Sequence, residues 1–355
     1  MKTNRITIKQ VAIESGVSTQ TVSRVINNRP DVAPETRKKV QRVIKRLSYH
    51  PSHIARSLIR GRSNTLGVVG FGLEYFGPSQ TLSGIEKQAN NLGFSLILYL
   101  VRDPVNHNVK KIISDMISRH VEGIIWAVPE IGRNREWIKD EKSFLSIPTI
   151  FLTMAQCDNQ SIVAVDNREG GRIATRHLIA QGCRNLGIIT GPLNWWEARQ
   201  RKLGFEDALT ESGLPLNEEL VFEGDWLPAS GERGIIKLLG KNLKMDGLFV
   251  CNDQMALGVL KATREKRKHI PDELAIVGFD DIPEAAYFYP PLSTVRQDVV
   301  ELGFCAVKEL GLLIEAIREG KKRVIKPKTI MIHPELVIRE SSILKNQNRS
   351  KLTTN

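Results

Sequence analysis

The chain has 355 residues, of which 41% are hydrophobic and 25% are charged. This ordinary globular composition excludes a mainly disordered chain, and the length allows two or three domains of about 100 to 150 residues each. The formal net charge is +12, and residues 1–62 hold 14 Lys and Arg against three acidic residues. Because such a surplus favours an anionic partner, the basic first segment and the near-neutral remainder are expected to have different electrostatic tasks.

No apolar run approaches the roughly 20 residues of a membrane-spanning helix, and the N-terminus lacks the apolar core of a signal peptide. We therefore expect a cytoplasmic protein with no membrane partner. The four cysteines lack the paired spacing of a zinc site or a redox motif, and we expect buried free thiols, no metal and no cofactor. These cysteines are Cys157, Cys183, Cys251 and Cys305.

Three short amphipathic periods, at residues 8–15, 19–26 and 36–47, predict an all-helical domain over residues 1–47. The first two periods form a helix-turn-helix motif at about residues 8–27. The small core predicted between these helices consists of Val11, Ala12, Val17, Val22 and either Val25 or Ile26.

The outward face of the second helix carries side chains suited to reading DNA. Gly16 provides the turn, and the Ser18 hydroxyl can cap the helix. A glutamine can bind adenine through two hydrogen bonds, an arginine can bind guanine in the same way, and hydroxyls can bind phosphates. A solvated basic helix would explain the charge, but not the turn, the cap and the polar face together. The outward residues are Thr19, Gln20, Ser23, Arg24 and Asn27.

Residues 48–63 are polar and basic and are interrupted by Pro and Gly, so we predict a hinge segment with at most one marginal helix, at residues 52–59. From residue 64 onward, β-branched runs alternate with amphipathic stretches, the pattern of βα units that build parallel sheets. These units exceed one compact core, so residues 64–342 are expected to form two similar α/β lobes. The polar residues 343–355 predict a disordered tail.

The predicted elements of the lobes follow from these runs and from the glycines that end them. Strands are expected at residues 66–71, 94–100, 123–128, 149–152, 162–165, 186–190, 248–251 and 275–279. Helices are expected at residues 79–92, 170–181, 197–212, 254–265 and 299–319. Glycine tolerates the left-handed backbone of a helix C-cap, and four glycines are placed for it, namely Gly93, Gly182, Gly213 and Gly320.

The segment from Val17 to Asn27, VSTQTVSRVIN, resembles the most specific block of the lac repressor family of bacterial transcription regulators. The similarity covers essentially the whole chain. It implies an all-α helix-turn-helix DNA-binding head and a two-lobed α/β sensor domain like the periplasmic binding proteins, with parallel sheets. The resemblance implies that Thr19, Gln20 and Arg24 read bases. It also implies phosphate contacts from Thr7, Ser18, Thr21, Ser23 and Asn27.

The hinge segment also resembles the family, through Tyr49, Pro51, Ala55 and Leu58. In the family this helix orders on DNA and inserts a leucine into the minor groove, so the resemblance implies that Leu58 is the wedge and Ala55 its neighbour. An isolated eight-residue helix is unstable in water, which fits folding that depends on DNA. Ser52 departs from the family, which usually has Asn there.

The lobes are expected to share the remaining chain in discontinuous pieces. We place the N-terminal lobe at about residues 64–165 and 295–326, and the C-terminal lobe at about 166–294 and 327–342.

A sugar-binding cleft between such lobes uses polar side chains at strand ends, because each sugar hydroxyl stripped of water must regain a hydrogen bond. An aromatic ring often covers the apolar face of the sugar. Several segments of this chain resemble the family's pocket. The resemblance implies effector contacts from Arg201, Trp226, Asn252, Asp280 and Gln297.

Each of these residues has another interpretation. An Asp280–Asp281 metal or acid–base pair is disfavoured, because neighbours on a strand point to opposite faces. Trp226 could be a core residue, and Asn252 could simply cap the following helix, although the family suggests both roles together. Either Trp195 or Trp196 could line the cleft, and the sequence does not choose between them.

Four positions depart from the lac repressor. Thr153 replaces an aspartate, Val299 replaces a phenylalanine, and Tyr75 and Phe76 replace smaller residues. The expected pocket is therefore related but reshaped.

Together these features predict a transcriptional repressor of carbohydrate-use genes, bound at the nucleoid as a homodimer to near-palindromic operator DNA. A small sugar or glycoside is expected to control its affinity for the operator allosterically. A sugar-transport binding protein would need an export signal and no DNA-reading head. An α/β enzyme is disfavoured as well, since the chain has no nucleophile elbow, phosphate-cradling glycine loop or metal-spaced His pair.

Overall fold

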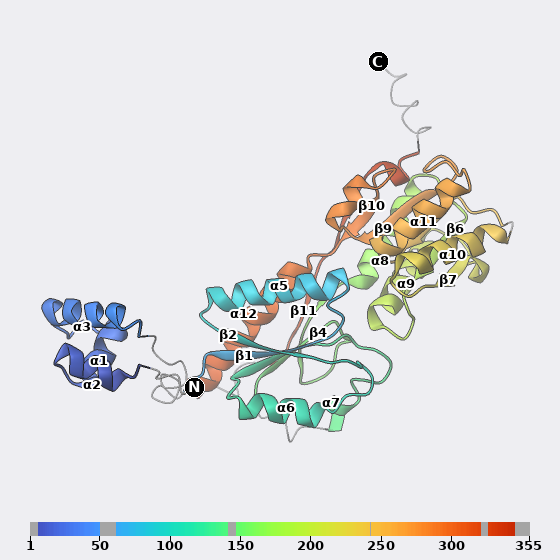
Figure 1. Ribbon diagram of the computed structural model, residues 1–355. Coiled ribbons are helices and arrows are strands. Elements are labelled where there is room, and N and C mark those ends of the chain that lie inside the picture. The colour runs from blue at the N-terminus through green and yellow to red at the C-terminus, as the bar shows by residue number, and fades with distance from the viewer. Residues whose placement is uncertain (1–5, 50–61, 141–146, 242, 321–325, 345–355) are drawn as a thin grey trace, which may run out of the picture. The chain divides into compact units, whose positions relative to one another are not determined.

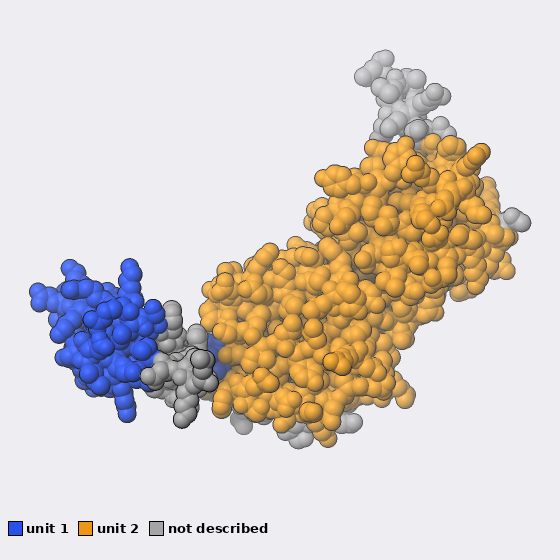
Figure 2. Space-filling model, in the orientation of Figure 1, with its two compact units in different colours: residues 1–64 blue, residues 65–355 orange. Residues whose placement is uncertain are grey.

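A computed structural model describes residues 6–49, 62–140, 147–241, 243–320 and 326–344. The chain forms two compact units, residues 1–64 and residues 65–355 (Figure 2). None of the helices in the described ranges is both long and apolar enough to cross a membrane.

The first unit is a bundle of three helices. They are α1 (Ile8–Ser15), α2 (Thr19–Ile26) and α3 (Pro34–Arg46). The first two have the predicted bounds, whereas α3 begins earlier because Pro34 fits the first turn of a helix. Gly16 has a φ of 62°, in the left-handed region that the turn requires. The fully or nearly buried core is Val11, Ala12, Val22, Val25, Val32, Val40 and Val43. Of the residues predicted for this core, Val17 and Ile26 are only partly buried and pack against it.

The first lobe of the second unit has a six-stranded, wholly parallel sheet in the order β11-β5-β4-β3-β1-β2. The strands are β1 (Thr65–Gly70), β2 (Ser95–Leu100), β3 (Gly123–Ala127), β4 (Thr149–Leu152), β5 (Ser161–Val165) and β11 (Thr329–Ile332). One face packs against α5 (Phe76–Asn91) and α12 (Val299–Arg318), and the other against α6 (Val109–Ser118) and α7 (Trp137–Asp140) (Figure 1).

The second lobe has a second six-stranded sheet in the order β12-β10-β9-β8-β6-β7, in which only the edge strand β12 is antiparallel. The strands are β6 (Leu186–Thr190), β7 (Val221–Glu223), β8 (Gly247–Val250), β9 (Ala275–Asp280), β10 (Ser293–Arg296) and β12 (Glu335–Val337). The helix pair α8 (Asn167–Ala180) and α9 (Trp196–Glu211) covers one face, and α10 (Pro228–Gly240) and α11 (Asp253–Glu265) cover the other. Short 3-10 turns span Glu218–Leu220, Pro283–Tyr287 and Glu340–Ser342.

Each expected strand and helix of the lobes is present, with ends shifted by a few residues. The four expected glycine C-caps all have positive φ, from 67° to 99°. The free thiols are confirmed, but only Cys183 and Cys251 are buried, because Cys157 lies in a partly exposed loop and Cys305 on a partly exposed part of α12.

The lobe boundaries need correction. Residues 327–342 were expected in the C-terminal lobe, but β11 pairs with β5 and so belongs to the first sheet. Conversely, β10 pairs with β9, so residues 295 and 296 belong to the second sheet. The chain therefore crosses between the lobes after β5, after β10 and after β11. Neither β10 nor β11 was expected as a strand, so the sequence did not indicate which sheet these residues join.

The expected disordered tail, residues 343–355, begins too early. The side chain of Leu344 packs on the core of the second lobe, and its backbone N–H donates to the Gln181 side chain over 3.3 Å. Just before it, Ser341 and Ser342 are buried.

Three helix pairs pack with their backbones in close approach, and glycines from both helices allow it. A Cβ atom added to Gly204 on α9 would overlap the Arg168 carbonyl oxygen on α8, and one added to Gly258 on α11 would overlap the Pro228 carbonyl oxygen on α10. The third pair is α5 with α12. The glycines involved are Gly84 and Gly303, Gly171 and Gly204, and Gly231 and Gly258.

Candidate functional site

The predicted DNA-reading face lies on the exposed side of α2. Thr19, Gln20 and Arg24 are exposed, while Val22 and Val25 on the other side of the helix are buried. The Arg24 guanidinium lies 3.5 Å from the Asp31 carboxylate, and both side chains are about half exposed. An exposed pair of this kind contributes little to stability, so Arg24 can exchange this partner for a base or a phosphate at low cost.

The predicted phosphate contacts include the side chains that form the helix starts. Ser18 Oγ accepts the Thr21 N–H over 3.1 Å, and Thr7 makes a capping box with Gln10. Asn27 Nδ2 donates to the Ser23 carbonyl oxygen over 2.8 Å. Ala55 and Leu58, the predicted hinge contacts, lie outside the described residues.

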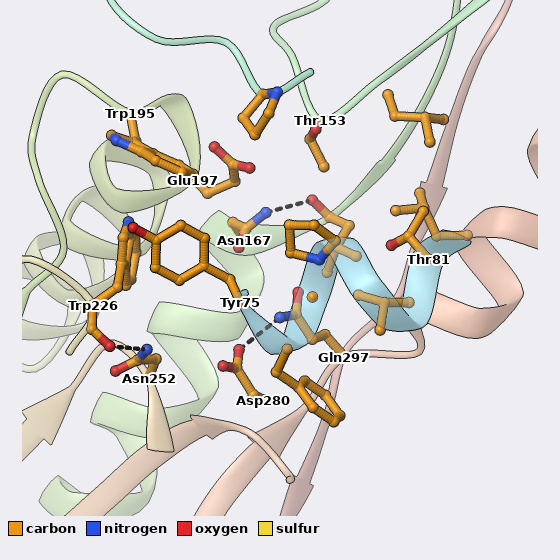
Figure 3. Close-up of a pocket in the computed structure, with 18 of the residues that line it drawn as sticks. Tyr75, Thr81, Thr153, Asn167, Trp195, Glu197, Trp226, Asn252, Asp280 and Gln297 are labelled. Carbon is orange, nitrogen blue, oxygen red and sulfur yellow. Dashed lines mark hydrogen bonds between the residues drawn. The ribbon is translucent and has the colours of Figure 1, made fainter. Parts of the chain in front are cut away.

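A pocket of about 810 Å³, part of it open to solvent, lies between the lobes of the second unit (Figure 3). Its walls come from the carboxyl ends of strands in both sheets, where ligands of open α/β sheets bind. The five predicted effector contacts all line it, so the structure brings together residues from five separate parts of the sequence. The polar or aromatic lining residues are Tyr75, Phe76, Thr81, Thr153, Asn167, Trp195, Glu197, Arg201, Trp226, Asn252, Gln254, Asp280 and Gln297.

Arg201 is the buried centre of this polar network, with 5% of its surface exposed. Its Nε donates to Asn167 Oδ1 over 2.8 Å, and its Nη1 donates to the Cys251 carbonyl oxygen and lies 3.6 Å from Asp280 Oδ1. The guanidinium also lies 3.7 Å from the centre of the Phe279 ring. Arg201 is thus held rigidly on several sides.

Asp280 ends β9 and receives a hydrogen bond from Gln297 Nε2 over 2.6 Å (Figure 3). Burial raises the pKa of its carboxyl to about 6, although Arg201 and Gln297 both favour the charged form. Asp280 has a φ of 117°, and Trp226 and Thr153 in the same pocket also have positive φ values. Such strained backbone clusters at functional sites, where it fixes side chains for a ligand.

Asn252 and Trp226 each have a structural role and also line the pocket, so both interpretations left open by the sequence apply to them. Asn252 Oδ1 caps α11 by accepting the Met255 N–H over 2.8 Å, while its Nδ2 donates to the Trp226 carbonyl oxygen over 2.9 Å. The Trp226 ring is 7% exposed and packs in the core of the second lobe, yet it lines the pocket. Its indole Nε1 has no hydrogen-bond partner among the described residues.

Asp281 does not line the pocket, but strand alternation is not the reason, because β9 ends at Asp280 and Asp281 has a φ of 54°. Its carboxylate pairs with Arg296 and Arg339, each over 2.7 Å. The pocket therefore receives one carboxylate from this pair. Within the described ranges, no three His, Cys, Asp or Glu side chains are grouped as a metal site would need.

The two adjacent tryptophans, Trp195 and Trp196, lie in different environments. Trp195 lines the pocket, and its ring centre lies 5.9 Å from those of Tyr75 and Trp226. Trp196 instead packs into the core of the first lobe, although α9 belongs to the second. Thr153 and Val299, two of the departures noted above, also line the pocket, as do Tyr75 and Phe76.

The sequence interpretation did not identify Asn167, Glu197 or Gln254 as pocket residues. Each stands in the first turn of a helix, namely α8, α9 and α11. A polar residue directly after a strand or at a helix start was the available signal, but such residues are also ordinary caps.

Comparison with known proteins fits this geometry. Residues 7–52 match the family described as bacterial regulatory proteins, lacI family, and residues 175–342 match a periplasmic binding protein-like domain. The HTH-type transcriptional repressor PurR of Haemophilus influenzae (strain PittEE) is 36% identical over 94% of this chain and 98% of its own.

Two solved structures extend the comparison. The lac repressor dimer bound to operator and the anti-inducer ONPF has a TM-score of 0.84 at 29% identity, over 96% of this chain and 100% of its own. The transcriptional regulator CelR in complex with cellobiose has a TM-score of 0.70 at 27% identity, over 95% and 100% of the two chains. This chain therefore belongs to the lacI family of bacterial regulatory proteins, and it is a DNA-binding transcriptional repressor rather than an enzyme.

Proposed function

We propose that a small sugar or glycoside bound between the lobes controls the affinity of this repressor for its operator, and that the controlled genes serve carbohydrate use. The observation that carries the proposal is the convergence of Arg201, Asn252, Asp280 and Gln297 on a pocket with aromatic walls. Hydroxyl groups require such hydrogen-bonding partners, and the apolar faces of a sugar ring pack against rings such as Trp226. The repressor is inferred to work in the bacterial cytoplasm, at the nucleoid.

The effector class is tested by thermal unfolding of the full chain with glucose, galactose, cellobiose, lactose and methyl β-glucoside, with adenine and guanine as a contrast. A ligand present at 100 times its dissociation constant adds about 2.7 kcal/mol to the free energy of unfolding. A marked rise in Tm with a sugar supports the proposal. A rise with a nucleobase and with no sugar would replace the sugar by a flat heteroaromatic effector.

Control of the operator is proposed to follow from linkage. If the effector and DNA prefer different closures of the lobes, a coupling of about 1–3 kcal/mol makes a useful switch. Operator titrations with and without the stabilising sugar measure this coupling. Equal affinities at saturating sugar would show that the pocket does not regulate DNA binding.

Base reading is proposed for Thr19, Gln20 and Arg24, and Arg24→Ala tests it. The variant is expected to lose about 1–3 kcal/mol of discrimination at one base pair in each half-site, because arginine contacts a base edge. Arg42→Ala, which changes an exposed arginine on α3, serves as the control and should leave base preference unchanged. Binding of a randomised operator library measures both variants. An unchanged preference for Arg24→Ala would remove this residue from the reading face.

A homodimer is proposed as the form that binds two half-sites. It is supported by a groove beside α11 whose apolar and aromatic lining residues stand beside three charged ones, Lys261, Arg264 and Glu265. The former are Leu257, Leu260, Phe288 and Tyr289, and Tyr289 and its neighbour Tyr287 are 81% and 88% exposed. Apolar surface of this kind favours burial against another protein surface.

Leu257→Asp is expected to shift the chain from dimer to monomer, because a buried unpaired carboxylate strongly opposes association. Light scattering after size-exclusion chromatography measures the mass. Ile117→Asp, which changes another exposed apolar residue in the first lobe, is the control. A Leu257→Asp chain that stays dimeric would place the interface elsewhere.

A further inference from the structure

The turn that carries the pocket carboxylate has strained backbone. Asp280 and the next residue, Asp281, have φ values of 117° and 54°, in the region that residues with a side chain rarely adopt. Asp280 lines the pocket, whereas Asp281 does not. Backbone of this kind persists only where surrounding contacts hold it, so the contacts that hold this turn decide where the Asp280 carboxylate lies.

Asp253 supplies one of these contacts from outside the pocket. Its neighbours Asn252 and Gln254 line the pocket, but Asp253 does not, and it is 0% exposed. Its Oδ2 accepts the Ile282 N–H over 3.0 Å, directly after the strained pair. An acidic residue in the first turn of a helix such as α11 is ordinary, but a helix start alone does not explain a carboxylate without exposed surface.

Thr294 on β10 completes the contact. Its Oγ1 donates to Asp253 Oδ1 over 2.6 Å, and the same oxygen accepts the Asp281 N–H over 3.4 Å. Thr294 is also 0% exposed, and it lies opposite Gly278 in the sheet. A Cβ atom on Gly278 would lie 2.2 Å from Asp253 Oδ1, so the glycine leaves the space that the carboxylate fills. We call Asp253 and Thr294 the turn clamp, because together they bond the N–H groups of the two residues that follow Asp280.

The turn clamp belongs to a set of contacts that join the turn to one strand. The chain runs from Thr294 on β10 to Gln297, whose Nε2 donates to Asp280 Oδ1 over 2.6 Å (Figure 3). Between them, Arg296 pairs with Asp281 over 2.7 Å. Gln297 meets the Asp280 carboxylate itself, whereas the turn clamp holds the backbone. Loss of the clamp should therefore displace the carboxylate without removing a side chain from the pocket.

We propose that Asp253 and Thr294 are positioning residues for the effector, and that the turn clamp fixes the Asp280 carboxylate for the effector without touching it. This inference rests on the proposed sugar effector. It deepens that proposal, because it names two residues outside the pocket on which the affinity for the sugar depends. A hydrogen bond weakens steeply when its atoms are misaligned, so a small shift of the Asp280 carboxylate should weaken sugar binding.

The first test removes the Thr294 hydroxyl and keeps the shape of the side chain. The probe is whichever of glucose, galactose, cellobiose, lactose and methyl β-glucoside binds the unmodified full chain in a calorimetric titration. Thr294→Val should lower the affinity for that sugar about tenfold, because the displaced carboxylate loses much of one charge-assisted hydrogen bond. Thr294→Ser keeps the hydroxyl and should stay within about threefold of the unmodified protein.

Thr263→Val is the matched control for Thr294→Val. Thr263 lies on α11 and is 1% exposed, and its hydroxyl donates to the Leu260 carbonyl oxygen over 3.0 Å within the same helix. The control thus removes a hydroxyl of equal burial from the same lobe without touching the turn. Its sugar affinity should stay within about threefold of the unmodified protein.

A double-mutant cycle separates positioning from a general structural role. Asp280→Gly removes the carboxylate, and glycine accepts the positive φ. Alone it should lower the affinity about 10- to 100-fold. Adding Thr294→Val to Asp280→Gly should then change the affinity by less than about threefold, because the clamp acts through the missing carboxylate. A loss of about tenfold in both backgrounds would mean that Thr294 supports the lobe as a whole, and would overturn the proposal.

Hydrogen exchange of the turn is a second measurement, and it needs no sugar. The clamp bonds the Asp281 and Ile282 amides, so residues 278–285 should exchange at least about tenfold faster in Thr294→Val. Asp253→Asn should have the same effect, because an amide has one acceptor oxygen where the carboxylate has two. Unchanged exchange in both variants would show that other contacts hold the turn, against the proposal.

The outcomes distinguish the two proposals. If a sugar binds the unmodified protein and Thr294→Val binds it as tightly as Thr263→Val does, the turn clamp has no positioning role and the sugar effector stands. If none of the five sugars binds the unmodified protein, both proposals fail.

Discussion

Replacing Arg201 with alanine should abolish the effector response and lower the free energy of unfolding of the unit at residues 65–355 by about 3–5 kcal/mol. The substitution leaves the Asp280 carboxylate buried without its positive partner, and it removes the donors to Asn167 and Cys251. Chemical denaturation measures the stability, and sugar titration measures the response. Operator affinity of the folded variant should remain, because the reading face belongs to the other unit.

The same variant should have a characteristic pH dependence. The pKa of Asp280 already lies above its ordinary value of 3.8, and loss of Arg201 raises it further. Because the folded state then binds more protons than the unfolded chain, stability should increase as the pH falls through the raised pKa. Arg201→Ala should therefore recover part of its lost stability between about pH 8 and pH 5, where the unmodified protein changes less.

Two controls bound this result. Arg172→Ala breaks partly exposed pairs with Glu169 and Glu211 and should cost no more than about 1 kcal/mol. The double variant Arg201→Met with Asp280→Asn should regain stability, because it no longer buries an unpaired carboxylate. It should not regain the effector response, because the hydrogen bonds that Arg201 made are still missing. A folded Arg201→Ala protein that still responds to sugar would exclude Arg201 from the site.

Gly258→Ala is the second change with a large expected effect, a loss of about 3 kcal/mol or more in the free energy of unfolding. The new methyl group would meet the Pro228 carbonyl oxygen of the neighbouring helix. Backbone cannot rotate away as a side chain can, so α10 and α11 would have to separate. Gly240→Ala is the matched control, because nothing lies within 4 Å of the added atom, and it should be neutral or slightly stabilising.

The glycine contacts also join the fold to the pocket. A Cβ atom on Gly171 would overlap the carbonyl oxygen of Arg201 itself. Gly171→Ala should therefore weaken sugar binding and also lower the free energy of unfolding. Gly258→Ala should mainly lower the free energy of unfolding and have a smaller effect on sugar binding. If the loss of sugar affinity relative to the loss of unfolding free energy were the same in Gly171→Ala and Gly258→Ala, the packing of Gly171 on Arg201 would have no specific effect on the pocket.

The first unit was predictable almost to the residue because its signals are local. Ser18 caps α2, Gly16 makes the turn, and Val22 and Val25 alternate with exposed polar positions. The strands β7, β10, β11 and β12 were not predicted, because they have only three or four residues and lack a clear buried alternation. Their sheet membership depends on partners far away in the chain.

The pocket shows the same division. Arg201 and Asn252 stand in segments that resemble the family's pocket segments, and this resemblance allowed both to be predicted as residues of one pocket. The backbone bridge between Ile131 and Trp195 could not be predicted from the sequence, because it joins two lobes through residues about 60 positions apart. The sequence could not tell for a similar reason that Trp195 lines the pocket and Trp196 packs in the core of the first lobe. Only the contact between the lobes distinguishes the two positions.

The three crossings between lobes have a consequence for synthesis on the ribosome. β11 is an edge strand of the first sheet and β12 of the second, and both lie within residues 329–337. Neither lobe can complete its sheet before this late stretch has emerged, so nascent chains expose two unfinished edges at once. The lobes are therefore expected to mature together rather than one after the other, and neither can be exchanged between relatives as a single contiguous cassette.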